Sequence, residues 1–246
     1  SAAGQSVSIV APIVFCRDMD WTGATNTPDF VAGSNNSLEL YGSLTFIAAM
    51  NSPSNSFAGR VYFMSTSLGE TITMAGQRLG SSVYFNGVGA EWSFLDFFSA
   101  FFVRIVTGTV TTNGNDASIS YMTTSGNNPC TLNLSTSIIT ILGNGSSAWN
   151  TRSTGFVVNA GTSLIQFTYI GSSDIQMEAN GQTFYDVTFV DPTTEGEIDG
   201  SLNTFRNVIF NGPAVISGSH TFSTATINED GIISDDNTFG TLTFTA

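Results

Sequence analysis

The sequence contains no lysine, and its six basic side chains are all arginines. Nineteen acidic residues leave a formal net charge of −13. A chain with this balance repels the phosphate backbone of a nucleic acid and the anionic headgroups of a membrane surface. We therefore expect neither nucleic acid nor membrane lipid among its partners.

Charged residues of either sign are scarce, at 10% of the chain, against roughly 25% in an average globular domain. Serine, threonine, asparagine and glycine supply the polarity instead. This composition, in a chain rich in β-branched and aromatic residues, is typical of extracellular proteins. We expect an extracellular or cell-surface location.

The chain has a single histidine, His220, and no Gly-x-Ser-x-Gly motif. Catalysis by an activated nucleophile, which needs an adjacent base, therefore has no support. His220 falls where sister repeats carry asparagine, so we expect an exposed or stacked corner residue.

Cysteine is also rare, since only Cys16 and Cys130 occur, and no Cys-x-x-Cys spacing supports a metal site. The sequence leaves open whether they are two separate thiols or one disulfide.

No stretch of 18 apolar residues exists that could insert into a membrane. The nearest, "FLDFFSAFFVRIV" (94–106), is interrupted by Asp96 and Arg104. We interpret it as a buried strand with a bend. The chain starts at Ser1 without a signal-peptide pattern and ends in the strand-like "TLTFTA", so we expect a segment of a longer chain.

What the sequence does contain is a repeat. "NTFRNVIFNG" (203–212) belongs to a series in which Thr-Phe recurs at 183–184, 204–205, 221–222 and 238–239. A unit of about 20 residues cannot bury its own apolar face and must stack on its neighbours.

Similar pairs occur earlier in the chain. "VYF" at 61–63 returns at 83–85, and "NLSTSIITI" (133–141) matches "NAGTSLIQF" (159–167). Because the same residues recur at one-turn spacing, we predict an all-β fold, a single right-handed parallel β-helix with about 20 residues per coil, rather than an antiparallel sandwich.

Within "TFRNVIF" the residues alternate. Phe205, Val208 and Phe210 are predicted to point inward, and Asn203 to supply the left-handed conformation of a corner. The equivalent phenylalanines are predicted to stack in register: Phe184, Phe205, Phe222 and Phe239. We expect one continuous solenoid over 1–246, with irregular first coils (1–36), central coils (37–180) and regular Thr-Phe repeats (181–246).

Four stretches, at 15–30, 69–100, 153–189 and 203–212, resemble β-solenoid segments of very large secreted or surface adhesin-like proteins of gliding and environmental bacteria. "GETITMAGQRLGSSVYFNGVGAEWSFLDFFSA" (69–100) carries most of the resemblance. It implies a structural or adhesive solenoid without a catalytic motif. Ala90 and Cys130 depart from the pattern of that family.

Paired carboxylates would be needed to cleave a polysaccharide, at roughly 5–9 Å from each other. Asp18 and Asp20 are the candidate pair, and Trp21 is a candidate sugar platform. Glu91, Trp92 and Asp96, in "EWSFLD", are interpreted as a core tryptophan with a corner acid that accepts backbone N–H groups.

Two stretches, "DPTTEGEIDG" and "NEDGIISDDN", are rich in acids, and neither matches a known calcium loop. We expect solvated acidic loops, with a weak calcium site as the alternative. Its candidate ligands are Asp191, Glu195, Glu197, Asp199, Glu229 and Asp230.

The sequence therefore predicts a non-enzymatic extracellular shaft, structural or adhesive, without a cofactor. Its expected partners are other segments of the same chain, neighbouring subunits and surface glycans. The alternative is a β-helix that binds or cleaves carbohydrate, like a tail spike or a polysaccharide lyase. Carboxylates and aromatics converging in one groove would favour the alternative, whereas scattered acids favour the shaft.

Overall fold

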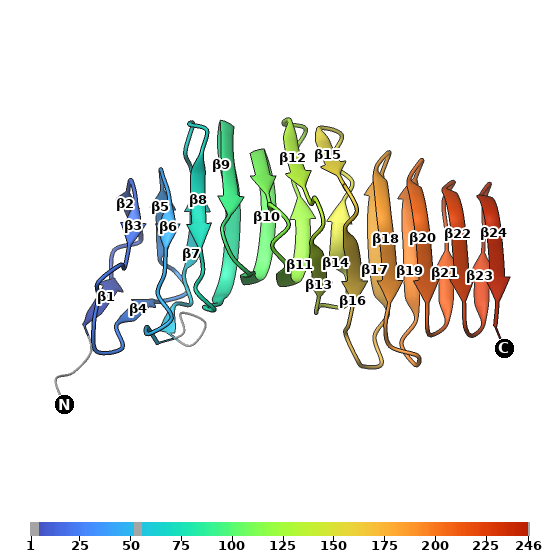
Figure 1. Cartoon of the computed structure of the whole chain (residues 1–246), viewed down its shortest axis with the longest axis horizontal. Helices are drawn as coiled ribbons and strands as arrows, with labels where there is room; N and C mark the ends of the chain where they lie inside the picture. The colour runs from blue at the N-terminus through green and yellow to red at the C-terminus, as the bar shows by residue number, and fades with distance from the viewer. Residues whose placement is uncertain (1–4, 52–55, 246) are drawn as a thin grey trace.

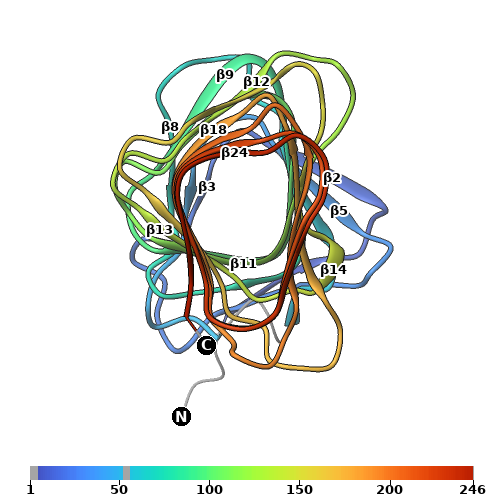
Figure 2. The same cartoon turned by 90° about the vertical axis from the view of Figure 1, so that its right-hand side faces the viewer.

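The computed structural model describes residues 5–51 and 56–245, which form an all-β parallel solenoid with roughly 22 residues per coil. The coils lie side by side along one axis from the N- to the C-terminal end (Figure 1). Seen down that axis in Figure 2, the chain rises toward the viewer from the right side over the top to the left, so the coil is right-handed. The predicted fold is confirmed, with coils slightly longer than the expected 20 residues.

Each coil contributes short strands to three faces, and neighbouring coils pair in parallel. Face 1 contains β2 (Ile13–Cys16), β5 (Ser37–Leu40), β7 (Arg60–Phe63), β14 (Gly145–Thr151), β17 (Ile175–Asn180), β19 (Gly196–Ser201), β21 (Ala214–Ile216) and β23 (Gly231–Ile233). Face 2 contains β3 (Met19–Asp20), β6 (Leu44–Thr45), β8 (Glu70–Thr73), β12 (Cys130–Asn133) and β15 (Phe156–Asn159). Face 3 contains β13 (Ile138–Ile141) and β16 (Leu164–Phe167).

Longer strands bend around corners and serve more than one face. They are β9 (Leu79–Phe94), β10 (Phe98–Thr111), β11 (Ala117–Thr124), β18 (Thr183–Phe189), β20 (Thr204–Phe210), β22 (Thr221–Ile227) and β24 (Thr238–Phe244). At the N-terminal end, β1 (Ser6–Ile9) pairs in parallel with β4 (Asp29–Ala32), and a bridge joins Ala32 to Phe57.

The core is a set of columns in which one buried side chain lies above the next. Strand residues alternate between interior and surface, so each coil repeats the same inward positions. On face 1 the inward column is Leu38, Val61, Val83, Val103, Met122, Trp149, Met177, Ile198 and Ile216. Continuous burial of this kind supplies the main stabilising free energy of the stack.

The repeats recognised in the sequence are confirmed as stacked neighbours. The motif at 61–63 pairs with that at 83–85, and Asn133 pairs with Asn159. Ring centroids of the Thr-Phe column are 5.3 Å apart for Phe184 and Phe205, and 5.0 Å for Phe205 and Phe222.

The last ring, Phe239, lies 4.9 Å from Phe222 and is only partly buried, because β24 pairs on one side alone.

Asn203, predicted to supply the left-handed conformation of the corner, has a different role. Asn203 is buried, and the left-handed conformation belongs to Leu202, at φ 58°. The Asn203 side chain accepts a hydrogen bond from the Gln182 N–H at 3.0 Å and donates one to the Ala179 carbonyl at 2.7 Å. The asparagine therefore satisfies backbone groups of the preceding coil inside the corner.

The bend predicted within 94–106 is confirmed, since β9 ends at Phe94 and β10 begins at Phe98. Burial of the whole stretch is not confirmed, because Leu95, Phe97 and Phe101 are exposed. Asp96 lies in the bend and accepts backbone N–H groups of Met74 at 2.7 Å and Ala75 at 2.6 Å. The corner-acid role of Asp96 is therefore confirmed, as is full burial of Trp92.

Candidate functional site

The proposed acid pair near the N-terminal end is occupied by local hydrogen bonds. Asp18 accepts the Ser43 N–H at 2.9 Å, and Asp20 accepts the Thr22 N–H at 2.8 Å. Hydrogen bonding by the Thr22 side chain, and then by its N–H, lowers the pKa of Asp20. Trp21 lines the same surface hollow as Asp18 and Asp20, but it is buried against Phe30, with ring centroids 6.0 Å apart. It therefore offers too little exposed ring to serve as the predicted sugar platform.

The six calcium candidates do not come together. Among the described residues, no group of three or more His, Cys, Asp or Glu side chains is placed to hold a metal ion. Asp191 accepts hydrogen bonds from the Thr193 hydroxyl and from the N–H groups of Thr193 and Thr194, and these bonds lower its pKa. Glu229 and Asp230 are exposed in the loop before β23, whereas Glu195 precedes β19 in a different coil.

Glu197 and Asp199 lie on strand β19 of face 1 rather than in a loop. Burial is the main cause that raises the pKa of Glu197, and the neighbouring Asp199 adds to it. Asp199 pairs with Arg152. Arg206 pairs with Asp186, at 2.6 Å.

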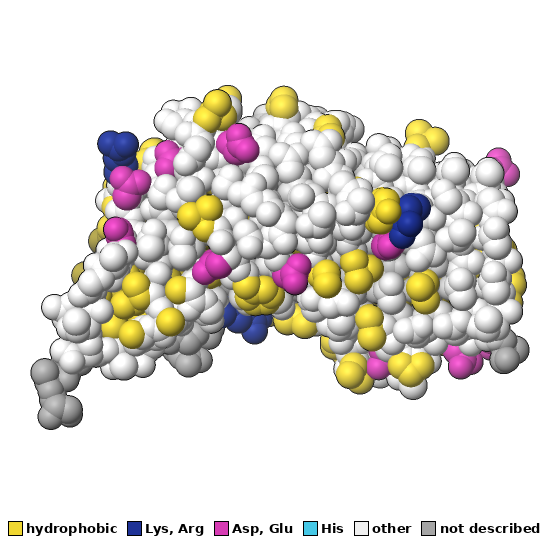
Figure 3. Space-filling model, in the orientation of Figure 1, with side chains coloured by type: hydrophobic (Ala, Val, Ile, Leu, Met, Phe, Trp, Pro, Cys, Tyr) yellow, Lys and Arg dark blue, Asp and Glu magenta, His cyan; other side chains and the backbone are white. Residues whose placement is uncertain are grey.

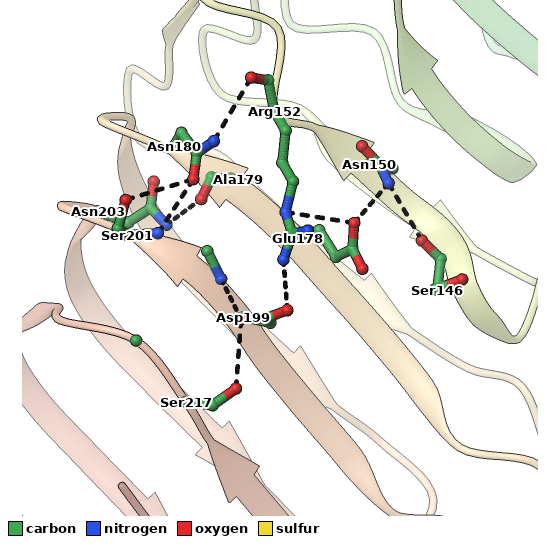
Figure 4. A network of polar contacts seen from close by, with 12 residues as sticks. Ser146, Asn150, Arg152, Glu178, Ala179, Asn180, Asp199, Ser201, Asn203 and Ser217 are labelled. Atoms are coloured by element: carbon green, nitrogen blue, oxygen red, sulfur yellow. Dashed lines mark hydrogen bonds and ion pairs between the residues drawn. The ribbon is translucent and has the colours of Figure 1, made fainter. Parts of the chain in front are cut away.

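Arg152 joins three coils of face 1 in a polar network (Figure 4). Its Nε lies 3.4 Å from Oε2 of Glu178, and its terminal nitrogen pairs with Asp199. Asn150 donates to Glu178 from one side, and Ser217 donates to Asp199 at 3.3 Å from the other. The arginine thus pairs with two carboxylates that follow one another in register, and its single positive charge offsets one of their two negative charges.

Glu178 is nearly inaccessible to water, at 7% exposure. Burial raises its pKa, Arg152 opposes that shift, and Asp199 adds to it. Two adjacent carboxylates with different environments could in principle divide acid and base roles. Here the Arg152 guanidinium pairs with both carboxylates, so the arrangement is suited to holding neighbouring coils together.

His220 continues the buried corner column of Gln182 and Asn203. It is 2% exposed, so it is a stacked residue and not an exposed one. Its Nε2 lies 2.9 Å from the Ser217 carbonyl, and its ring packs edge-on against Phe205 and Phe222. Burial lowers its pKa, which keeps the ring neutral at pH 7.

Cys16 and Cys130 are both free thiols, in coils far apart along the stack. Burial raises the pKa of Cys130 to about 11, and that of Cys16 is raised by burial and by Asp18. The two cysteines are therefore separate thiols and not a disulfide.

The outward column of face 1 carries the most distinctive surface. Consecutive coils place these residues in register: Phe15, Glu39, Tyr62, Tyr84, Arg104, Thr123, Asn150, Glu178 and Asp199. One end is aromatic, the other is the polar network of Arg152, and Arg104 lies between them.

Around Arg104 is an aromatic–arginine patch, defined as Tyr84, Phe101, Phe102, Arg104 and Tyr121. The Arg104 guanidinium carbon lies 5.1 Å from the Phe102 ring centroid and 5.9 Å from that of Tyr84. Phe101 is 44% exposed and meets Tyr121 edge-on, with centroids 5.5 Å apart.

Beside this patch is a shallow hollow. It is lined by Phe101, Phe102, Tyr121, Asn144, Gly145 and Ser146. The Tyr121 hydroxyl donates to Asn144 Oδ1 at 3.3 Å, which fixes the orientation of both groups at the rim.

Sequence reasoning missed this patch. The repeated "VYF" motif was a usable signal, because its tyrosine alternates with two buried residues and must point outward. The position of Phe101 had no such signal, since it depends on a register shift between β9 and β10.

Comparisons with known proteins gave no match to a family model, a curated protein or a solved structure. Over residues 5–51 and 56–245, no helix is long and apolar enough to cross a membrane.

Proposed function

We propose that this chain is a non-enzymatic extracellular shaft, a segment of a large adhesin-like bacterial surface or filament protein. The observation that carries the proposal is the unbroken outward column of face 1, which runs in register from Phe15 to Asp199. Such a column spaces and displays side chains along a rod, as extended solenoid surfaces do.

The distribution of the acids supports a shaft over a carbohydrate-cleaving enzyme. Asp18, Asp20 and Asp96 each bind backbone N–H groups, and Glu178 and Asp199 share one arginine. On the face drawn in Figure 3, acidic side chains lie apart from one another. Carboxylates that already accept backbone N–H groups or pair with an arginine are poorly placed to protonate a leaving group or activate water.

The adhesive part of the proposal rests on exposed aromatic residues. Phe15 is 62% exposed and Phe101 44%, and both lie along face 1. Aromatic and arginine side chains are enriched where protein surfaces bind partners. The location outside the cell follows from the low charge content and from the resemblance to surface proteins.

Bead attachment tests the proposal. Beads coated with the chain are exposed under flow to surfaces carrying bacterial and algal polysaccharides, and the soluble fraction is assayed for new reducing ends. We expect the beads to be retained without reducing ends, and beads with heat-unfolded chain to detach. Release of reducing ends that disappears in Glu178→Gln or Asp20→Asn would establish an enzyme instead.

A further inference from the structure

We infer that the aromatic–arginine patch binds acidic sugars, with the carboxylate of a uronate on Arg104 and a sugar ring over Phe101. The inference rests on the adhesive role proposed above and names the ligand class of one place on the shaft. It starts from the pairing of the arginines. Arg17, Arg152 and Arg206 have carboxylate partners, whereas within the described part of the chain Arg60, Arg78 and Arg104 form no ion pair.

Arg104 is held in place without neutralisation. Its Nε donates to Thr123 Oγ1 at 3.1 Å, and its guanidinium lies near the Phe102 and Tyr84 rings. These contacts fix the guanidinium while its terminal nitrogens have no carboxylate partner in the described structure. A planar guanidinium is matched to a carboxylate through two parallel hydrogen bonds.

The nearest acids in the outward column are too far away to offset the positive charge of Arg104. Glu39 and Glu178 are each three coils from Arg104 in register. At about 4.8 Å per coil this is about 14 Å, beyond the screening length of about 8 Å at physiological salt. The patch is therefore locally cationic on a chain of net charge −13.

A second arginine approaches the patch from the neighbouring corner. The terminal nitrogen of Arg78 lies 3.5 Å from Ser120 Oγ, next in sequence to Tyr121. Its Nε is buried and has no hydrogen-bond partner among the described residues. Arg78 therefore adds a second positive charge near the Tyr121 end of the patch.

The aromatic component favours a sugar over a simple anion. The exposed Phe101 ring and the edge-on Tyr121 ring form an apolar corner beside the hollow, and Asn144 adds an amide at its rim. Aromatic faces carry partial negative charge, which attracts the C–H groups of a pyranose ring. A single-stranded nucleic acid also stacks on aromatics, but it needs cations along its whole backbone, and two arginines do not supply them.

The experiment compares trigalacturonate with its methyl ester by calorimetry at 150 mM salt. The ester keeps the ring and loses the charge. We expect the acid to bind at least about tenfold more tightly, because hydrogen bonds to charged groups contribute about 1.5–3 kcal/mol. Equal binding of acid and ester, or tighter binding of a thymidine hexanucleotide, would overturn the inference.

Substitutions in the aromatic–arginine patch test whether it is the binding site. Arg104→Gln and Phe101→Ala should each weaken trigalacturonate binding about tenfold, with Arg104→Lys intermediate because it keeps the charge and loses the fork. Arg17→Gln and Phe244→Ala are the matched controls, since both side chains are exposed and lie at opposite ends of the solenoid, away from the patch, and they should bind as the parent does. Circular dichroism confirms folding of each variant, and unchanged affinity in folded Arg104→Gln would refute the site.

The two proposals fail separately. If beads are retained on polysaccharides without preference for uronates, the shaft remains adhesive and only the acidic-sugar assignment is wrong. If no surface retains the beads and trigalacturonate does not bind, the adhesive role itself is wrong.

Discussion

Replacing Phe205 by alanine removes the middle ring of the most regular column. Phe205 has no exposed surface and packs between Phe184 at 5.3 Å and Phe222 at 5.0 Å. Truncation of a fully buried phenylalanine costs about 3–5 kcal/mol, and loss of two stacked pairs accounts for about 1–3 kcal/mol of that amount. We expect a loss of stability in this range.

Phe239→Ala provides the matched control. This ring has one stacked neighbour, Phe222 at 4.9 Å, and is only partly buried. We expect it to cost about half as much or less, because one ring pair and part of the burial are lost.

Urea unfolding followed by circular dichroism measures both variants, and hydrogen exchange locates the effect. Because each coil contacts only its neighbours, the loss of protection in Phe205→Ala should be confined to β18, β20 and β22 and the strands beside them. The reasoning is refuted if Phe205→Ala costs no more than Phe239→Ala, or if protection is lost evenly along the chain.

Three further outcomes are expected. Because burial raises the pKa of Glu178, the folded chain binds its proton more tightly than the unfolded chain, and stability contributed by protonation is lost as pH rises through the folded pKa. In the parent chain the urea midpoint of unfolding should therefore decrease as pH rises from 4 to 7, and Glu178→Gln should make this decrease smaller. The same pH dependence in parent and variant would refute the role of Glu178. Cys130, with its pKa raised to about 11, should resist a thiol reagent at pH 8 until urea unfolds the chain, while Cys16 reacts first; rapid labelling of Cys130 in the folded chain would contradict its burial. Millimolar calcium should shift the melting temperature by no more than a few degrees, and a large rise that is lost in Asp230→Asn would show that the acidic stretches bind it.

The sequence was sufficient for the fold because the fold repeats. Recurrence of Thr-Phe at one-turn spacing identified both the parallel stacking and the inward position of Phe205. Alternation along the strand then gave the inward positions of Val208 and Phe210. Neither inference needed knowledge of contacts between distant segments, because each coil contacts copies of itself.

Corners and surface pairings were less predictable. The left-handed residue proved to be Leu202, which nothing in its side chain indicates, and the inward amide of Asn203 depends on the Ala179 carbonyl of another coil. The pairing of Arg152 with Asp199, 47 residues away, depends on how many residues separate the coils. Coil length varies too much for sequence spacing to give that alignment.

Deleting one coil tests the central claim, that the chain is a shaft of equivalent coils, most directly. Residues 204–220 form one repeat, since Thr204 pairs with Thr221 and their removal joins Asn203 to Thr221. Small-angle scattering and circular dichroism should show a folded rod shorter by about 4.8 Å with an unchanged strand signal per residue. Deletion of 204–212, which removes β20 and leaves β21, should unfold the C-terminal coils. Loss of structure in both deletions alike, or in neither, would contradict the account.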